Sequence, residues 1–385
     1  MPAATAGGRP RRWRRVAVAG SATAVGVALT STAAGAWYYA DELLRVRPDP
    51  PEFPLTVVAV TGSTVTLSGT GADQPGLLGV HWPGGYARVG PDVRVVRASG
   101  TAGTVVRGLR AYPDTPAVGA TVRLDFYAAP LEPAELATVT GLDVGEIGYD
   151  GPLGRYPATY LPAAGGARWV VHVHGRGGSR AEGYRLMPAL HTAGYPQLSV
   201  AYRNDDGAPA DPGGEFGLGW TESDDLAAAV SEARARGARD VILAGYSMGG
   251  AIIGNYLRTH GSDGVAGVLY DAPALSWPDI LTYQAAQRGM PRFAARVAAT
   301  AVRWRAGVDL IAMDQVTRAE RLDVPVFLAH GANDSTVPVS SSDALAAARP
   351  DLVTYLRTDA EHVQSWNVDP DHYETRVLDF LARLR

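Results

Sequence analysis

The sequence predicts an α/β fold with a mostly parallel sheet, preceded by a small all-β module and an apolar N-terminal helix. Three observations predict this order. No charged residue occurs from Val16 to Ala40, short β-branched runs fill Leu55 to Tyr127, and short apolar runs alternate with helix-length segments from Trp169 onwards. At 385 residues the chain is also longer than one average domain.

The N-terminal segment has the pattern of a membrane insertion signal. A helix over Val16–Tyr39 would rise about 36 Å, enough to cross a hydrocarbon core of roughly 30 Å. Several arginines precede it, and Trp37, Tyr38 and Tyr39 follow where an interfacial aromatic belt belongs. We expect a basic cytoplasmic tail over residues 1–15 and a single-pass anchor over 16–40, with an extracytoplasmic catalytic domain at the cell membrane. Because Ala34-Gly35-Ala36 resembles a cleavage site, a removed signal peptide and secretion are the alternative.

A proline-rich linker over residues 41–54 leads into the all-β module, which we place at residues 55–137. Glycine and proline punctuate its β-branched runs, as is typical of a small barrel or sandwich of five or six strands. No cluster of residues in it carries obvious chemistry. The runs are Leu55–Val60, Thr64–Leu67, Leu77–His81, Val93–Arg97, Thr104–Leu109 and Val122–Tyr127.

Residues 138–385 have the rhythm of a catalytic α/β domain. A hairpin with Asp150-Gly151 in its turn comes first, and a closing amphipathic helix comes last. The long excursion over residues 274–321 is too large for a simple crossover and indicates an inserted helical cap. The predicted strands between are Trp169–His174, Gln197–Tyr202, Val241–Ala244, Val265–Tyr270, Val324–Ala329 and Leu352–Leu356.

Composition excludes several kinds of chemistry. The chain has no cysteine, so disulfides, thiolate nucleophiles and cysteine-ligated metals are impossible. It has no lysine either, which excludes a pyridoxal Schiff base and a Walker-type phosphate lysine. With a net charge of −4 and only 19% charged residues, nothing favours a nucleic-acid partner.

The motif Gly245-Tyr246-Ser247-Met248-Gly249-Gly250 follows the predicted strand Val241–Ala244 and opens a helix. A Gly-x-Ser-x-Gly at a strand-turn-helix junction is a nucleophile elbow, in which a tight, strained turn exposes the serine. The flanking glycines let helix and strand approach without Cβ clashes. The sequence therefore predicts Ser247 as the nucleophile.

The partners of a serine nucleophile should come from loops at the carboxyl edge of the same sheet. Asp334 lies just past the predicted strand Val324–Ala329, and His362 lies past the next one. We predict Asp334 as the orienting acid and His362 as the general base. His372 is the alternative base, although it lies within the last helix. Other acids lie at the wrong end of the sheet or in the cap: Asp323, Asp309 and Asp314.

Two backbone N–H groups should stabilise the oxyanion that develops in the transition state. Met248, at the start of the helix, supplies one. The loop His174-Gly175-Arg176-Gly177-Gly178 supplies the other, most plausibly through Arg176 N–H. His172 and His174 share one strand face, as metal ligands can, but no third ligand cluster is visible, so we expect no metal.

These motifs resemble those of the α/β-hydrolase superfamily over residues 140–385, and the elbow is similar to that of monoacylglycerol-lipase and serine-aminopeptidase-like members. The resemblance implies a cofactor-free serine hydrolase with an acyl-serine intermediate and a cap that shapes the substrate pocket. We expect a carboxylic ester hydrolase acting on a small-molecule or lipid-like ester. A serine peptidase, an acyltransferase using the same acyl-enzyme, and a silent binding module are the alternatives. Ester identity, the role of the β module and the oligomeric state stay open.

Overall fold

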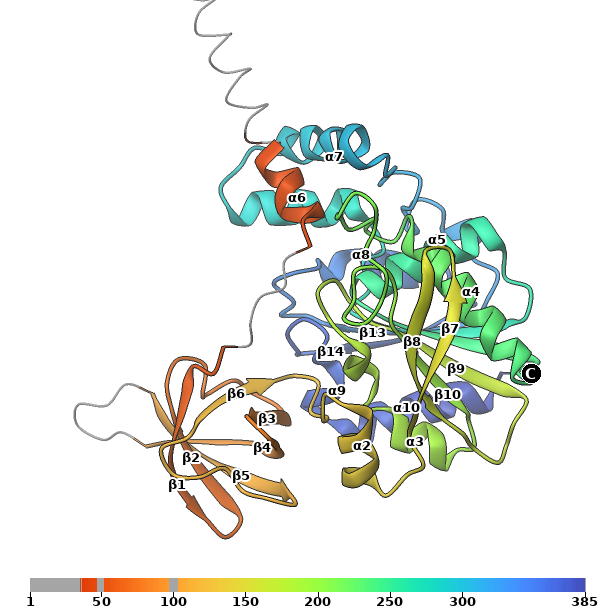
Figure 1. Ribbon diagram of the computed structural model, residues 1–385. Coiled ribbons are helices and arrows are strands. Elements are labelled where there is room, and N and C mark those ends of the chain that lie inside the picture. Colours follow the sequence, from red (N-terminus) through yellow and green to blue (C-terminus); the bar gives the residue numbers. More distant parts are fainter. Residues whose placement is uncertain (1–34, 36, 47–51, 97–102, 385) are drawn as a thin grey trace, which may run out of the picture.

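The computed structural model describes residue 35 and residues 37–46, 52–96 and 103–384 (Figure 1). Within them the chain forms a closed six-stranded barrel, an eight-stranded mixed sheet covered by helices, and a helical cap. In Figure 1 the barrel and the cap lie at opposite ends of the molecule. The predicted fold class is thereby confirmed for the α/β unit and for the all-β module.

The barrel has the strand order β1-β2-β5-β4-β3-β6, and β6 pairs back onto β1 to close it. Alternate residues of β1, such as Leu55 and Val57, are buried inside, as the twofold repeat of a strand requires. β4 begins earlier than the sequence predicts, because Gly90 and Pro91 interrupt its apolar pattern at an irregularity in the pairing. The strands are β1 (Leu55–Thr61), β2 (Thr64–Ser68), β3 (Leu78–Trp82), β4 (Gly85–Val96), β5 (Thr104–Tyr112) and β6 (Thr121–Asp125).

The large sheet has the order β14-β13-β12-β11-β9-β10-β8-β7. The strands from β9 to β14 are parallel, whereas β8 and β7 form an antiparallel hairpin at one edge. The parallel strands therefore present their carboxyl ends at a single rim. The strands are β7 (Gly145–Gly151), β8 (Gly154–Leu161), β9 (Arg168–Val173), β10 (Gln197–Val200), β11 (Asp240–Tyr246), β12 (Val265–Asp271), β13 (Val326–Gly331) and β14 (Val353–Thr358).

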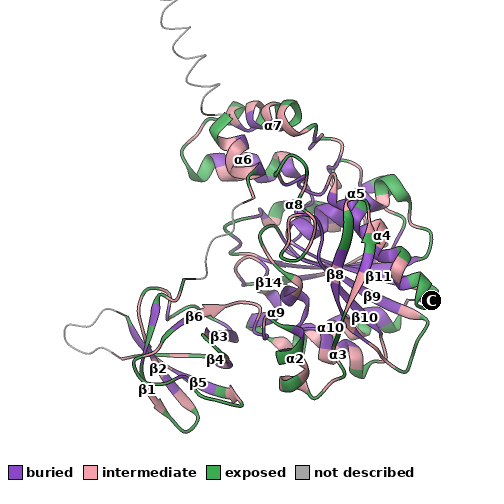
Figure 2. Cartoon of the chain, viewed as in Figure 1, coloured by how far each residue is buried: buried purple, intermediate pink, exposed green. Residues whose placement is uncertain are grey.

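Helices cover both faces of this sheet, and its central strands are buried throughout (Figure 2). Val171 and Leu243 pack with α4 and α5 on one face, while Val170 and Ile242 pack with α3 and α10 on the other. Burial of each such side chain contributes about 1.5–3 kcal/mol. The helices are α2 (Pro133–Thr140), α3 (Met187–Thr192), α4 (Glu222–Ala235), α5 (Met248–His260), α6 (Trp277–Gln287), α7 (Phe293–Ala306), α8 (Val339–Ala348), α9 (Ser365–Val368) and α10 (Pro370–Ala382), with 3₁₀ turns at Arg180–Gly183 and Ala319–Arg321.

The cap consists of α6 and α7, which lie between β12 and β13 in the sequence. Trp277 is buried and anchors the first turn of α6, because its indole N–H donates to the Leu218 carbonyl at 3.0 Å. Phe293 and Trp304, by contrast, lie on the outer face of α7 and are 54% and 77% exposed. The cap therefore uses only part of its aromatic surface to cover the sheet.

A short helix over residues 37–44, which we call the stem helix, packs beside α6 and α7 (Figure 1). Ala40 and Leu44 are completely buried in the core of the α/β unit. This differs from the expected linker at 41–54 and from an interfacial position for Tyr39. An apolar face that packs on protein has the same composition as one that faces lipid, so the sequence could not distinguish them.

The rest of the predicted membrane segment, residues 16–34, lies outside the described residues. Among the residues that the structure describes, no helix has both the length and the hydropathy needed to cross a membrane.

The barrel contacts the α/β unit close to the loop that carries His362. The Asn367 side-chain amide on α9 donates to the carbonyls of Leu77 and Phe126 at 2.6 and 2.8 Å, and the Asn367 carbonyl accepts from the Leu77 amide at 2.8 Å. Arg185 bridges the same region by donating to the Phe126 and Val363 carbonyls. The barrel is thus attached to the segment that follows the predicted catalytic histidine.

Candidate active site

Ser247 lies at a tight turn between β11 and α5, with φ 50° and ψ −116°. A residue other than glycine rarely has a positive φ, so the backbone at this turn is strained and neighbouring contacts must hold it in place. The Ser247 amide donates to the Asp271 carbonyl at 3.2 Å, and the Ser247 carbonyl accepts from Ala274 at 2.8 Å. A Cβ atom at Gly249 would overlap the Val173 carbonyl, so the elbow needs glycine there.

The structure brings the three predicted catalytic side chains together. The Nε2 atom of His362 lies 2.9 Å from Ser247 Oγ, and its Nδ1 atom lies 2.7 Å from Asp334 Oδ2. Since β11, β13 and β14 end at the same rim of the sheet, their loops meet there. An acceptor at Nδ1 fixes the tautomer, so that Nδ1 carries the proton and Nε2 faces the hydroxyl with its lone pair.

The Asp334 carboxylate is buried and accepts hydrogen bonds on both oxygens. Oδ1 accepts from the Thr336 and Val337 amides at 2.8 and 2.7 Å, and Oδ2 accepts from His362 and His330. Burial alone would raise the pKa of this carboxyl, but the hydrogen bonds from His330, His362 and Val337 outweigh it and hold that pKa well below its ordinary range. Asp334 therefore stays ionised while it orients His362.

His330 is a site residue that the sequence analysis missed. Its Nε2 atom contacts both Asp334 Oδ2 at 3.1 Å and the Val337 carbonyl at 3.2 Å, and its Nδ1 atom lies 2.6 Å from Ser342 Oγ. Both partners of Nε2 are acceptors, so Nε2 carries the proton and Nδ1 accepts from the serine. The available signal was its position four residues before Asp334, at the end of the same strand.

In the loop after β9, the Gly175–Arg176 peptide is held through its carbonyl group. The Gly175 carbonyl accepts from the Tyr202 hydroxyl at 2.9 Å and lies 2.8 Å from His174 Nδ1. In a trans peptide the C=O and N–H groups point in opposite directions, so the Arg176 N–H points away from this pair. Gly175 also approaches the nucleophile, because a Cβ placed on it would lie 2.9 Å from Ser247 Cβ.

The amide of Gly175 donates to the buried carboxylate of Glu182 at 2.6 Å, which fixes the loop from a second direction. Met248, the first residue of α5, has one of the N–H groups that a helix leaves without an intrahelical acceptor. Arg176 and Met248 both line the cavity that contains Ser247. The loop and the helix start therefore border the nucleophile together.

His172 and His174 are buried and have protein partners. The rings of His174 and Tyr202 are stacked 4.3 Å apart, and His174 Nε2 lies 2.7 Å from the Asp205 carboxylate. Burial would lower the pKa of His174, but Asp205 outweighs it and raises that pKa. His172 contacts Gln197 and Tyr246, and burial lowers its pKa to about 4. Within the described chain, no three His, Asp or Glu residues are grouped as metal ligands.

The alternative acid and base residues lie elsewhere. His372 is exposed in the first turn of α10, and Asp314 accepts from Ser276 and Thr317 inside the cap. Asp323 accepts from the Ser262 hydroxyl at the opposite end of the sheet. Asp309 binds the Ala312 amide. None of these contacts Ser247 or His362.

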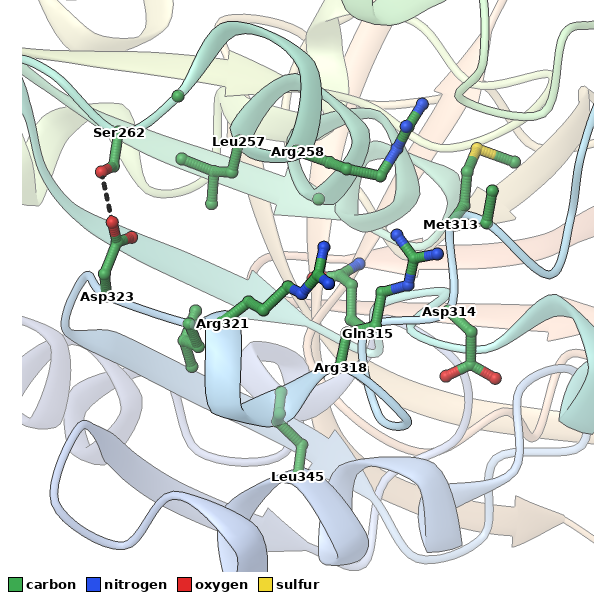
Figure 3. A pocket seen from close by; sticks show the side chains of 14 residues that line it. Leu257, Arg258, Ser262, Met313, Asp314, Gln315, Arg318, Arg321, Asp323 and Leu345 are labelled. Carbon is green, nitrogen blue, oxygen red and sulfur yellow. Dashed lines mark hydrogen bonds between the residues drawn. The ribbon is translucent and has the colours of Figure 1, made fainter.

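A cavity of about 260 Å³ lies over Ser247. From the cap it is lined by the apolar side chains of Trp277, Ile280 and Leu281 and by the polar side chains of Gln284 and Arg288, and Val337 lines it from the acid loop. A second cavity of about 240 Å³ lies where α5 ends and the cap returns to the sheet, lined by side chains that include Arg258 and Arg318 (Figure 3). It contains none of the predicted site residues and is therefore not a candidate reaction site.

Comparison with known proteins places the chain in a family. A family model described as "Alpha/beta hydrolase family" matches residues 170–382, more than half of the chain, and a domain of unknown function matches residues 56–125. The uncharacterized protein YqkD of Bacillus subtilis is 27% identical over 171 residues. That match covers 43% of this chain and 56% of the relative, so the chain spans little more than half of that relative's length.

A solved structure shows the same fold, and a second is reported for comparison. The esterase Pf2001 of Pyrococcus furiosus is 19% identical and superimposes with a TM-score of 0.51, over 66% of this chain and 95% of the esterase. A putative aryl esterase from Burkholderia cenocepacia is 21% identical, with a TM-score of 0.46, over 62% and 98% of the two chains. The residues that the family model matches include the parallel strands from β10 to β14 and the loops that carry Ser247, Asp334 and His362. The chain belongs to the alpha/beta hydrolase family.

Proposed function

We propose that the protein is a carboxylic ester hydrolase that works through an acyl-serine intermediate. One observation carries the proposal: the hydroxyl of Ser247, the imidazole of His362 and the carboxylate of Asp334 form a continuous hydrogen-bonded chain at 2.9 and 2.7 Å. Such a chain lets an imidazole accept the hydroxyl proton while the carboxylate stabilises the imidazolium that forms. Ser247 lines a cavity to which α6 contributes the apolar side chains of Trp277, Ile280 and Leu281.

The reaction has two halves. His362 takes the proton of Ser247, and the serine oxygen attacks the ester carbonyl to give a tetrahedral intermediate. His362 then protonates the leaving alkoxide, and the C–O bond to it breaks. In the second half a water molecule gives its proton to His362, attacks the acyl-serine carbonyl and releases the carboxylic acid, while the proton returns to Ser247.

The backbone N–H groups of Met248 and Arg176 stabilise the oxyanion in both halves. The support is local: both residues border the cavity beside Ser247, and the Gly175 carbonyl is held on the far side of the Arg176 peptide. Preorganised donors of this kind act where charge develops, and each contributes a factor of about 10²–10³ in kcat.

The cavity favours a compact acyl or alcohol group. Its volume of about 260 Å³ is slightly smaller than the usual range for ligand pockets, roughly 300–1,000 Å³. Trp277, Ile280 and Leu281 of α6 form an apolar part of the wall, while Gln284 of α6 and Glu42 of the stem helix add polar groups to it. We rank small apolar esters above aminoacyl amides as substrates because of the apolar part of this wall.

We also propose that the enzyme is tethered to the cell membrane with its catalytic domain on the extracytoplasmic side. The arginine-flanked apolar segment at residues 16–40 supports this location. Near the end of that segment, the exposed ring of Trp37 lies 5.6 Å from the exposed ring of Trp304 in an edge-on contact, which gives the described part of the chain an aromatic surface there. Cell fractionation with protease protection tests it: a protected, soluble protein would contradict the location.

The activity is tested with a panel of p-nitrophenyl esters of rising acyl length and a panel of aminoacyl anilides, assayed on the full chain. We expect turnover of the short esters, little turnover of the anilides, and loss of activity in Ser247→Ala. Product analysis with an added alcohol separates hydrolysis from acyl transfer. Preferential turnover of anilides, or ester turnover that survives Ser247→Ala, would contradict the proposal.

A further inference from the structure

The cavity over Ser247 has a wall that belongs to neither the sheet nor the cap. Tyr39, Glu42 and Leu43 of the stem helix line it together with Ser247 and Met248. These three residues lie more than 100 positions before the first strand of the parallel sheet in the sequence, on the far side of the barrel. A segment that precedes the barrel in the sequence thus borders a cavity of the domain that follows the barrel.

Main-chain contacts fix the stem helix to the α/β unit. The Phe216 amide donates to the Leu44 carbonyl at 2.7 Å, and Arg45 forms an isolated antiparallel bridge with Glu215. Ala40 and Leu44 are 0% exposed and pack in the same hydrophobic cluster as Met248 and Trp277. Because protein interiors are close-packed, two completely buried side chains hold the helix in one orientation. Its inward face therefore has a defined position relative to the nucleophile.

Side chains of the cap hold the outer end of the stem helix. Arg305 of α7 forms ion pairs with Asp41 at 3.3 Å and with Glu215 at 2.5 Å, and its own side chain is only 14% exposed. Arg288, which follows α6, donates to the Tyr39 hydroxyl at 3.0 Å and lies over its ring. The Arg176 guanidinium donates to the Glu42 carbonyl at 3.3 Å, so the predicted oxyanion loop also contacts this helix.

We propose that the stem helix is part of the substrate-binding site and that Leu43, with Tyr39, sets the size of the ester group accepted beside Ser247. The inference rests on the proposed ester hydrolase activity and deepens it. The group that fits is compact and apolar, because Leu43 lines the same small cavity as Trp277, Ile280 and Leu281 of α6. The segment that leads from the predicted anchor into the barrel is therefore a specificity element.

The test changes the depth of the cavity in the full chain. Leu43→Trp should fill the wall and lower kcat/KM for a p-nitrophenyl hexanoate at least tenfold, while p-nitrophenyl acetate changes less than threefold. Leu43→Ala should shift the ratio of hexanoate to acetate kcat/KM the opposite way, by roughly tenfold. Tyr38→Trp is the matched control, since Tyr38 lies on the same helix but is 67% exposed and outside the cavity.

Labelling of Ser247 by a small fluorophosphonate separates this inference from the activity on which it rests. If the wild type labels and hydrolyses esters but the hexanoate to acetate ratio is unchanged in both Leu43 variants, the stem helix is not a specificity element. If the wild type neither labels nor hydrolyses esters, the proposed function fails as well. If Leu43→Trp does not fold, Leu43→Ala decides, because a folded variant with an unchanged ratio overturns the inference.

Discussion

Tyr202 offers a test of how one oxyanion donor is oriented. Its hydroxyl donates to the Gly175 carbonyl at 2.9 Å, and that carbonyl belongs to the same peptide as the Arg176 N–H. Burial raises the pKa of Tyr202 well above its ordinary value, so the hydroxyl stays a neutral donor across the working pH range. Tyr202→Phe removes this hydrogen bond and leaves the ring stacked on His174.

The magnitude follows from one lost neutral hydrogen bond. Such a bond contributes about 1 kcal/mol net. If all of this stabilisation is lost in the transition state, kcat falls roughly fivefold. Complete loss of the Arg176 donor would cost about 10²–10³, which sets the upper limit. KM should stay within about twofold, since the oxyanion forms only after the substrate has bound.

Steady-state kinetics with a p-nitrophenyl ester measures the effect, and Tyr184→Phe is the control. Tyr184 is also buried, and its hydroxyl contacts Thr159 on β8 and not the Gly175 carbonyl. We expect kcat to fall for Tyr202→Phe and to stay within twofold for Tyr184→Phe. Equal kcat values for the two variants would refute the orienting role of Tyr202.

Three further predictions test the support around the triad. His330→Ala removes one of the donors to Asp334 and should lower kcat roughly tenfold in steady-state assays with little change in KM; an unchanged kcat would contradict the role given to His330. Burial lowers the pKa of His172, so the free energy of unfolding should fall by up to ~3 kcal/mol as the pH drops from 6.5 to about 4. Urea unfolding at several pH values should show a smaller fall for His172→Gln than for the wild type. An equal fall in the two proteins would refute this role of His172. Gly249→Ala forces a methyl group into the Val173 carbonyl and should destabilise the fold by about 1–3 kcal/mol; an unaltered thermal midpoint would show that the elbow is looser than described.

Sequence reasoning could predict that these three side chains lie together because each follows a local rule. Ser247, Asp334 and His362 each come directly after an apolar run that forms a strand of one parallel sheet, so their order along the chain implies a shared rim. The same rule gave the Gly175 loop. Chain order and strand pattern are local properties, which a single sequence carries.

The contacts that hold the loop after β9 beside Ser247 join residues from separate segments, and the sequence contains no pattern for them. Asp205 and Tyr202 reach His174 across a loop, and Glu182 binds the Gly175 amide from a 3₁₀ turn. Each depends on side-chain direction within the folded core. The stem helix was assigned to an anchor and a linker for a related reason, because its buried face is defined only by the protein surface that it meets.

The assignment of Ser247 as the covalent nucleophile is tested most directly by trapping the acyl-enzyme. A rapid acid quench after mixing the full chain with a p-nitrophenyl ester, followed by peptide mass analysis, should find one acyl group on the peptide that contains Ser247. The amount of p-nitrophenol released in the first turnover should match that adduct, and His362→Ala should form neither at a comparable rate. Turnover without an adduct on Ser247, or an adduct on another residue, would contradict the account.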